Sequence, residues 1–138
     1  MKNPPIGSLV EIKVEAPVNP SEDPEKVSDA ITKVLMKCMP EFRYGSRMIG
    51  KTTGPEALAL IYEQVRSRSA MGVLRRMLLD NRAGQSTWFF LNKQAAAAGI
   101  ASVIEEEQES PLGPIRVSIN CEELDPLIDW LAPESRRH

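Results

Sequence analysis

The sequence has few of the residues on which most enzyme and metal sites depend. Histidine occurs once among 138 residues, as His138 at the end of the chain. The two cysteines, Cys38 and Cys121, lie far apart and fit no metal-ligand spacing. These absences remove histidine-based acid–base catalysis, Ser-His-Asp triads and most zinc sites. We therefore expect a protein that is not an enzyme, with no catalytic residue, no metal and no cofactor.

Nucleotide-binding signatures and long apolar runs are also missing. Neither GxGxxG nor GxxxxGK[ST] occurs, and "IGKTTG" (49–54) lacks the upstream glycine of a phosphate loop. We interpret this stretch as the end of a strand that runs into a helix cap at Thr53. No run reaches the ~18 apolar residues of a membrane span, and the N-terminus has no apolar signal core. The sequence thus predicts a cytoplasmic protein without a membrane partner.

The composition predicts one globular domain over residues 1–138, with 1–7 and 134–138 flexible. Its 42% hydrophobic and 26% charged residues are ordinary for such a domain. Period-2 patterns and β-rich composition predict strands at 8–16, 41–51, 85–92, 100–107 and 115–121. Helical spacing predicts helices at 24–38, with Asp23 as N-cap, at 93–99 and at 122–133.

The stretch 53–83 is also helical, but its apolar stripe shifts round the axis near Ser67–Gly72. It therefore predicts two helices or a kinked one. The last three predicted strands are close enough in sequence to pair as a meander. Together these elements predict an α+β fold, a two-layer sandwich with helices packed on one face of a mainly antiparallel (mixed) sheet.

Charge is distributed unevenly along the chain. Residues 1–42 carry −2, residues 43–93 carry nine Lys/Arg against three Asp/Glu (+6), and residues 94–138 carry three against nine (−6). Such asymmetry is typical of nucleic-acid-binding proteins. The alternative is that the basic middle and the acidic end neutralise each other across the fold.

Arginines in the basic segment carry the first binding hypothesis. Arg68, Arg75 and Arg82 are spaced by seven, with Arg66 and Arg76 beside them, so a continuous helix would place them in one stripe. Arginine suits phosphate because its planar fork donates two parallel hydrogen bonds. The alternative is a plain solvent-facing helix side. The predicted phosphate contacts are Arg68, Arg75, Arg76, Arg82 and Lys93.

A second candidate site is the stretch "LNKQAAAAG" (91–99). Asn92 is placed to cap a short helix, with Lys93 and Gln94 in its first turn and Gly99 past its end. Free N–H groups beside a lysine would suit an anion, which makes Asn92, Lys93 and Gln94 a candidate anion-binding helix start. The alternative is a structural turn between two strands.

The aromatic run Trp88–Phe90 supports a different function. Three consecutive residues cannot all face the core of a strand, so at least one faces away, and this argues against an aromatic stacking platform of the RRM type. Together with Met71 and Met77, the run favours a protein–protein adaptor or oligomerisation module, with a protein partner or homodimer instead of RNA.

Four blocks in register resemble an archaeal family of small uncharacterised proteins related to RNA-binding and predicted exosome-subunit-like proteins. They are "VEAPVNPSEDPEKV" (14–27), "FFLNKQAAAAG" (89–99), "LGPIRVSI" (112–119) and "IDWLAP" (128–133), and the agreement in order and spacing runs from about residue 9 to residue 133. The resemblance implies an α+β fold like that of the 5S-rRNA-binding ribosomal protein, RNA as the partner and no established activity. It covers Asn92, Lys93 and Gln94 by position.

Overall fold

The computed structural model describes residues 3–134 and shows an α+β fold, as the sequence predicts. Predictions about residues 1–2 and 135–138, including His138, lie outside the described residues. The strands are β1 (Glu11–Pro17), β2 (Glu41–Arg43), β3 (Arg47–Thr53), β4 (Ser86–Leu91), β5 (Val103–Ile104) and β6 (Ile115–Asn120). The helices are α1 (Pro24–Val34), α2 (Ala59–Ser67), α3 (Met71–Asp80), α4 (Lys93–Ala97) and α5 (Leu124–Leu131), with 3-10 turns at Pro55–Leu58 and Glu107–Glu109.

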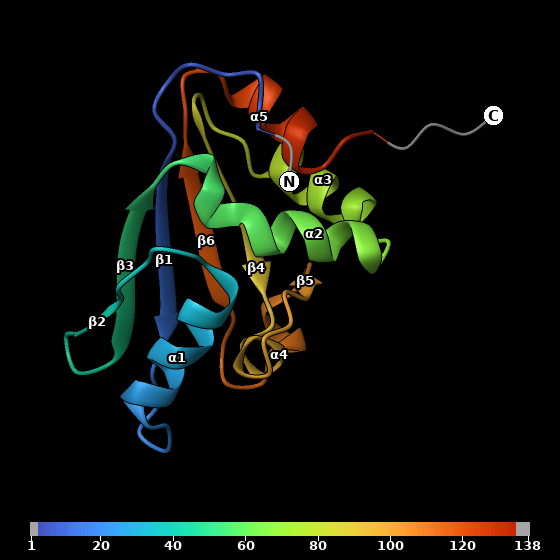
Figure 1. Cartoon of the computed structure of the whole chain (residues 1–138). Coiled ribbons are helices and arrows are strands. Elements are labelled where there is room, and N and C mark those ends of the chain that lie inside the picture. Colours follow the sequence, from blue (N-terminus) through green and yellow to red (C-terminus); the bar gives the residue numbers. More distant parts are fainter. Residues whose placement is uncertain (1–2, 135–138) are drawn as a thin grey trace.

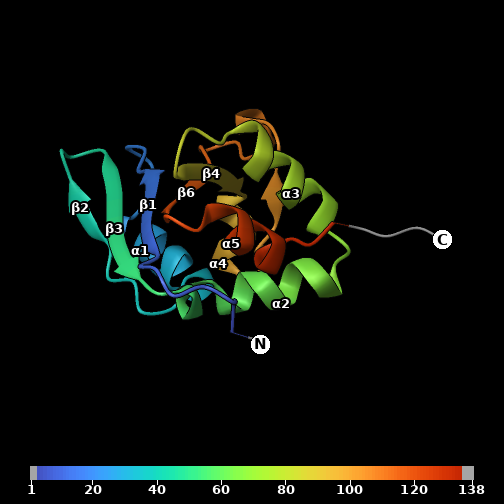
Figure 2. The ribbon, with the colours of Figure 1, turned by 90° about the horizontal axis from the view of Figure 1, so that it is seen from above.

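The six strands form one antiparallel sheet in the order β2-β3-β1-β6-β4-β5. Helices α1, α2 and α5 lie over one face of this sheet, and α3 packs beside β4 and β5 (Figures 1 and 2). The outward side chains of β3, β1 and β6, continued by Ser86 and Trp88 of β4, lie on the opposite side, which we call the open face.

Strict alternation along the central strands builds the core between the layers. In β1, Ile12, Val14 and Ala16 are at most 2% exposed, whereas Glu11 and Lys13 point to solvent. The apolar residues of β6 behave in the same way. Full burial of each such Val or Ile stabilises the fold by roughly 1.5–3 kcal/mol.

The aromatic run in β4 divides between the two faces as predicted. Phe89 is fully buried beneath the sheet, and Trp88 lies partly exposed on the other side. Met77 of α3 and Phe90 are also buried, at 8% and 7% exposure. The residues that suggested an exposed adaptor surface therefore belong largely to the core.

Two predicted helix boundaries are confirmed, the start of α1 and the break between α2 and α3, whereas α1 ends at Val34 and not at Cys38 as predicted. The Asp23 side chain accepts a hydrogen bond from the Glu25 amide (3.0 Å) and caps α1. The long helical stretch is broken between α2 and α3, where Ser69 adopts a positive φ of 55°. Helices α2 and α3 therefore point in different directions, and their arginines share no continuous stripe (Figure 1).

Four local predictions are wrong. The cap before the 3-10 turn at 55–58 is Gly54, without a side-chain hydrogen bond, and not Thr53. Residues 41–51 form a hairpin of two strands, because the turn at Tyr44–Gly45 reverses the chain. The predicted strand 100–107 shrinks to Val103–Ile104. The last three strands form no meander, because β4 lies between β5 and β6 and pairs with both.

The N-terminal segment is held by Glu123 at the start of α5, and the two cysteines lie in the core. The amides of Gly7 and Ser8 both donate to Glu123 Oε1 (2.9 Å each), which holds the pKa of that carboxyl below its usual value. Cys38 and Cys121 are both buried and unbridged. Burial raises the pKa of the Cys38 thiol, so it stays neutral at physiological pH.

Candidate nucleic-acid interface

The arginines predicted to bind phosphate are mostly engaged within the protein. Three of them contact carboxylates from the acidic end of the chain, in the ion pairs Arg75–Asp129, Arg76–Glu105 and Arg82–Asp125. Arg68 lies exposed at the end of α2 without an ion pair to a described residue. The alternative, in which the basic middle and acidic end neutralise each other, is confirmed at these pairs.

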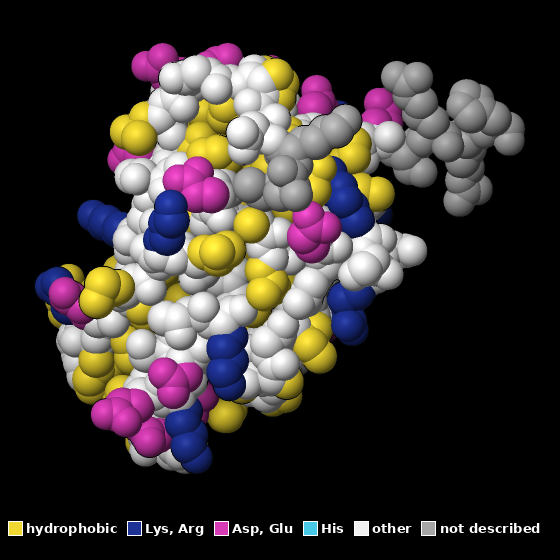
Figure 3. All heavy atoms as spheres, in the orientation of Figure 1, with side chains coloured by type: hydrophobic (Ala, Val, Ile, Leu, Met, Phe, Trp, Pro, Cys, Tyr) yellow, Lys and Arg dark blue, Asp and Glu magenta, His cyan; other side chains and the backbone are white. Residues whose placement is uncertain are grey.

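Arg75 and Arg66 are the most firmly held. Arg75 Nη1 donates to Asp129 Oδ1 (2.8 Å) and to the Ala132 carbonyl (3.1 Å), with its side chain 21% exposed. Arg66 donates to the carbonyls of Trp130 (2.8 Å) and Leu131 (3.1 Å). Both therefore fasten α5 to the neighbouring helices. Figure 3 shows the remaining charges of this side scattered, with acidic and basic groups interleaved.

The predicted helix start at Asn92 is present, but Lys93 points into the protein. Asn92 Oδ1 accepts from the Ala95 amide (2.9 Å), the predicted cap. Lys93 is 4% exposed at its side chain, and its Nζ donates to the carbonyls of Pro17 (2.7 Å) and Leu112 (2.8 Å) and to Glu22 Oε1 (2.9 Å). An ammonium has three protons, so none is left for a phosphate.

The rest of this cluster closes the helix start against solvent. The Lys93 amide donates to Ser110 Oγ (3.2 Å), and Gln94 Oε1 accepts from the same hydroxyl (3.0 Å). Gly113 (φ 92°) approaches Pro17 so closely that a Cβ would lie 2.3 Å from the ring. We call Lys93 with Glu22, Pro17 and Leu112 the lysine clamp. It joins the loop after β1 to the segment before β6.

The clamp sets the ionisation of Glu22. Burial acts to raise the pKa of this carboxyl, but hydrogen bonds from Asn19 and Lys93, together with the Lys93 charge, outweigh it. The pKa of Glu22 therefore lies below its usual value, and the carboxylate stays ionised down to acidic pH.

The open face carries a second set of basic groups. Its outward-facing side chains include Arg43, Arg47, Lys13, Lys51 and Arg116 against Glu11, Glu15 and Glu41, so five cations face three anions. Two of the anions are neutralised, Glu15 by Arg47 (2.9 Å) and Glu41 by Arg43. Lys13, Lys51 and Arg116 remain, opposed by Glu11 alone.

Lys13 and Lys51 stand directly opposite each other on neighbouring strands, and we call them the lysine pair. Both are exposed, and neither ammonium has a hydrogen bond or ion pair with a described residue. Like charges placed directly opposite each other destabilise a sheet. On the other side of Lys13 the register places Ser118 of β6, and beyond it Trp88 of β4. A cationic pair thus meets a hydroxyl in one row across the sheet.

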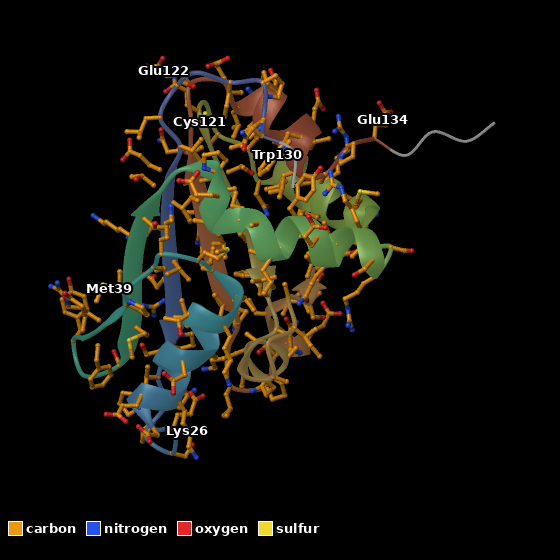
Figure 4. The ribbon with its side chains drawn as sticks, viewed as in Figure 1. Lys26, Met39, Cys121, Glu122, Trp130 and Glu134 are labelled. Atoms are coloured by element: carbon orange, nitrogen blue, oxygen red, sulfur yellow. The ribbon has the colours of Figure 1, made fainter. Side chains whose placement is uncertain are left out.

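Two hollows flank the lysine pair. The Asn120 hollow, of about 560 Å³, is lined by both lysines and by Glu11, Ser86, Ser118 and Asn120. The Tyr44 hollow, of about 450 Å³, lies toward β2 and is lined by both lysines with Met39, Arg43, Tyr44 and Ile49. Both volumes are in the range of small-ligand sites. Figure 4 places Met39 at the β2 edge of the sheet, and Lys26 far from it on α1.

Arg116 and Trp88 extend the basic face toward β4. The guanidinium carbon of Arg116 lies 4.3 Å from the centre of the Trp88 ring, a cation–π contact that leaves the arginine exposed. Trp88 in turn contacts Phe90, with ring centres 4.8 Å apart. The guanidinium of Arg116 thus covers the Trp88 indole, so the group presented to solvent at this position is a planar cation.

Sequence reasoning missed the lysine pair. The alternation of β1 indicates that Lys13 points outward, but nothing local indicates that Lys51, 38 positions further on, faces it. Among residues 3–134, no cluster of His, Cys, Asp and Glu could hold a metal ion. In the same range no helix is long and apolar enough to cross a membrane.

Comparison with known proteins shows the family to which the chain belongs. A family model described as RNA binding matches residues 11–121, from the start of β1 to the residue after β6. A UPF0201 protein from Methanothermobacter thermautotrophicus is 41% identical over 125 residues, 89% of this chain and 91% of that protein. The chain belongs to the UPF0201 family. A second UPF0201 protein, from Sulfurisphaera tokodaii, is 36% identical over 94% of this chain and 91% of its own length.

Solved structures agree with this membership. The crystal structure of a UPF0201 protein from Methanococcus jannaschii is similar with a TM-score of 0.77 and 28% identity, covering 91% of this chain and 95% of that one. A DUF54 protein from Methanothermobacter thermautotrophicus, at 19% identity, shares the fold with a TM-score of 0.62, over 89% and 95% of the two chains. The predicted archaeal relatives are confirmed, and the likeness to the 5S-rRNA-binding ribosomal protein stays a prediction.

Proposed function

We propose that this UPF0201 protein binds RNA without catalysing a reaction on it, and that the lysine pair on the open face contacts the phosphates. The observation that carries the proposal is the placement of Lys13 and Lys51 side by side in the register, exposed and without an internal partner. Their mutual repulsion is a cost that the fold itself does not require. A phosphodiester between the two ammonium groups would remove that cost.

The family description supports RNA as the ligand, and the ion pairs of the helix arginines favour the open face as its site. The model described as RNA binding covers all six strands and leaves out α5. The acidic partners of Arg75 and Arg82 both lie on α5, outside the match. Phosphate binding by those arginines would first have to break their ion pairs, whereas the lysine pair is free to bind.

A binding titration under two salt conditions tests the proposal. Labelled RNA with a stem and a single-stranded tail is titrated with the protein between about 50 mM and 200 mM salt. We expect Lys13→Glu with Lys51→Glu to weaken binding about 100-fold, because two charge-assisted hydrogen bonds to phosphate are removed. The slope of log affinity against log salt should also become shallower by about 0.7, the value for the one single-strand phosphate that the variant no longer neutralises.

Matched variants separate the open face from the helix side. Lys26→Glu changes the same charge on α1 and should leave the affinity within about twofold, apart from general charge effects. Arg68→Glu with Arg76→Glu tests the arginine hypothesis. If this second double variant abolishes binding and the lysine variant binds normally, the RNA site lies on the helices and the proposal is wrong. Absence of any RNA binding at low salt would also reject it.

An adaptor or homodimer remains the second candidate, and one observation favours it. Met39, Phe42 and Tyr44 are 86%, 45% and 83% exposed around the β2–β3 hairpin. Met39 and Tyr44 line the same hollow, and exposed apolar groups that share a surface are typical of interaction sites. Light scattering of the purified protein, with and without Met39→Lys, decides this candidate: a dimer that the variant dissociates would support it.

A further inference from the structure

The turn of the β2–β3 hairpin places an aromatic residue where the backbone favours a small one. Residues 43–46 form a turn closed by a hydrogen bond from the Ser46 amide to the Arg43 carbonyl (3.2 Å). Both central residues have positive φ, 60° at Tyr44 and 66° at Gly45, as a type I′ turn requires. Glycine meets this requirement at no cost, and the first position normally holds Asn, Asp or Gly.

Tyrosine at this position has no explanation within the described chain. A bulky side chain with positive φ is an uncommon and strained arrangement. No compensating contact is present, because Tyr44 is 83% exposed and its hydroxyl has no hydrogen bond with a described residue. The side chain therefore destabilises the turn without packing against the core. Strain of this kind is typical of positions whose contacts lie outside the chain.

The surroundings of Tyr44 indicate what it contacts. It lines the hollow that also contains both members of the lysine pair. Ile49 supplies an apolar surface there and Arg43 a planar cation, and the Glu41 carboxylate, which also lines the hollow, is neutralised by Arg43. An aromatic ring, an aliphatic surface and two free ammonium groups are the complement of a nucleotide, whose base stacks and whose phosphate is charged.

We infer that the Tyr44 hollow binds one nucleotide of single-stranded RNA, with its base stacked on Tyr44 and its phosphate on the lysine pair. This inference rests on the proposed function and adds the form of the RNA. In a duplex the bases are stacked on one another and their faces are not accessible to a side chain. The Tyr44 hollow therefore selects an unpaired base, and the lysine pair alone would bind either form.

Variants at Tyr44 test the stacking directly. Tyr44→Phe keeps the ring and should bind a single-stranded oligoribonucleotide as tightly as the unchanged protein. Tyr44→Asn should weaken that binding about tenfold, as expected when one base–aromatic stack is removed. The same variant should raise the midpoint of thermal unfolding, because Asn is favoured in this turn. Neither variant should alter binding of a blunt RNA duplex or of an abasic oligonucleotide, which keeps the phosphates and lacks the bases.

The outcomes separate this inference from the proposed function. If single-stranded RNA, duplex and abasic strand all bind equally, and Tyr44→Asn changes none of them while the lysine variant weakens all, the phosphate site stands and the stacking inference is wrong. If no RNA binds, both are wrong. If Tyr44→Asn leaves RNA binding unchanged but converts a dimer to a monomer in light scattering, Tyr44 belongs to a protein interface and the inference is overturned.

Discussion

Two lysine sites on opposite sides of β1 show how differently one fold uses the same residue. Lys93 lies in the interior with all three protons donated and a carboxylate, Glu22, beside it. Lys13 and Lys51 lie on the surface, opposite each other, and none of their ammonium protons is donated to a described residue. The hydrogen bonds and the charge of the Lys93 ammonium are satisfied within the protein, and those of the lysine pair are not.

Whether the hydrogen bonds of a lysine are satisfied within the protein separates structural from binding roles better than its charge does. A buried cation with complete hydrogen bonding stabilises a fold, and its removal leaves its partners unpaired. An exposed pair of like charges costs stability and gains a function only when a ligand arrives. Substitution by an uncharged residue should therefore have opposite effects on stability at the two sites.

Lys93→Met should produce the largest effect. It removes the cation beside the Glu22 carboxylate and one donor each to the carbonyls of Pro17 and Leu112, while Asn19 still donates to Glu22 and Leu112. Breaking such a buried ion pair costs about 3–5 kcal/mol. Urea unfolding followed by circular dichroism measures the loss. Lys26→Met, an exposed lysine on α1, is the matched control and should change stability by less than about 0.5 kcal/mol. A loss at Lys93 no larger than at Lys26 would show that the clamp does not hold the fold.

The sequence predicts one of these sites in part and the other not at all. The Asn92 cap and the following turn are local features, so "LNKQAAAAG" alone predicts them. The direction of Lys93 depends on Pro17 and Leu112, which are distant in sequence. The lysine pair depends on which strands are neighbours. Alternation gives the face of each strand, but its partner follows from packing of the whole chain.

The difference between local features and contacts of distant segments also explains which other predictions are right and which are wrong. The kink near Ser67–Gly72 is predictable because the apolar stripe shifts within one segment. The hairpin at 41–51 is not, since Tyr-Gly is an unusual dipeptide for a two-strand turn. The arginine stripe fails to form because α2 and α3 diverge, and because α5 brings acidic partners from the far end of the chain.

Acidification should weaken the lysine clamp through Glu22. Because the folded-state pKa of Glu22 lies below its ordinary value of 4.5, the carboxylate stabilises the protein above that value, and this contribution is lost as the pH falls through the lowered pKa. Glu22→Gln should therefore cost about 1.5 kcal/mol at pH 7, the low end for a hydrogen bond to a charged group. Its difference from the unchanged protein should shrink below about pH 4.5.

Urea unfolding at pH 7 and at acidic pH measures this difference. Glu25→Gln, in the first turn of α1, is the control because it is exposed and lies outside the clamp. A Glu22→Gln deficit that stays constant with pH would mean that the shape of the side chain matters and its charge does not.

The smallest expected change in stability, at Lys51, measures most directly the difference between the lysine pair and the lysine clamp. Lys51→Met removes the repulsion from Lys13 and should stabilise the protein by a few tenths of a kcal/mol at low salt, less at high salt. The same substitution at Lys93 destabilises the protein, so the sign of the change in unfolding free energy alone separates the two sites.

Methionine also changes the packing, and a double-mutant cycle with Lys13→Met removes that contribution. Because either substitution already abolishes the repulsion, the double variant should gain less than the sum of the two singles. Strict additivity would mean that the two ammonium groups do not interact, and the reason for placing a phosphate between them would be lost.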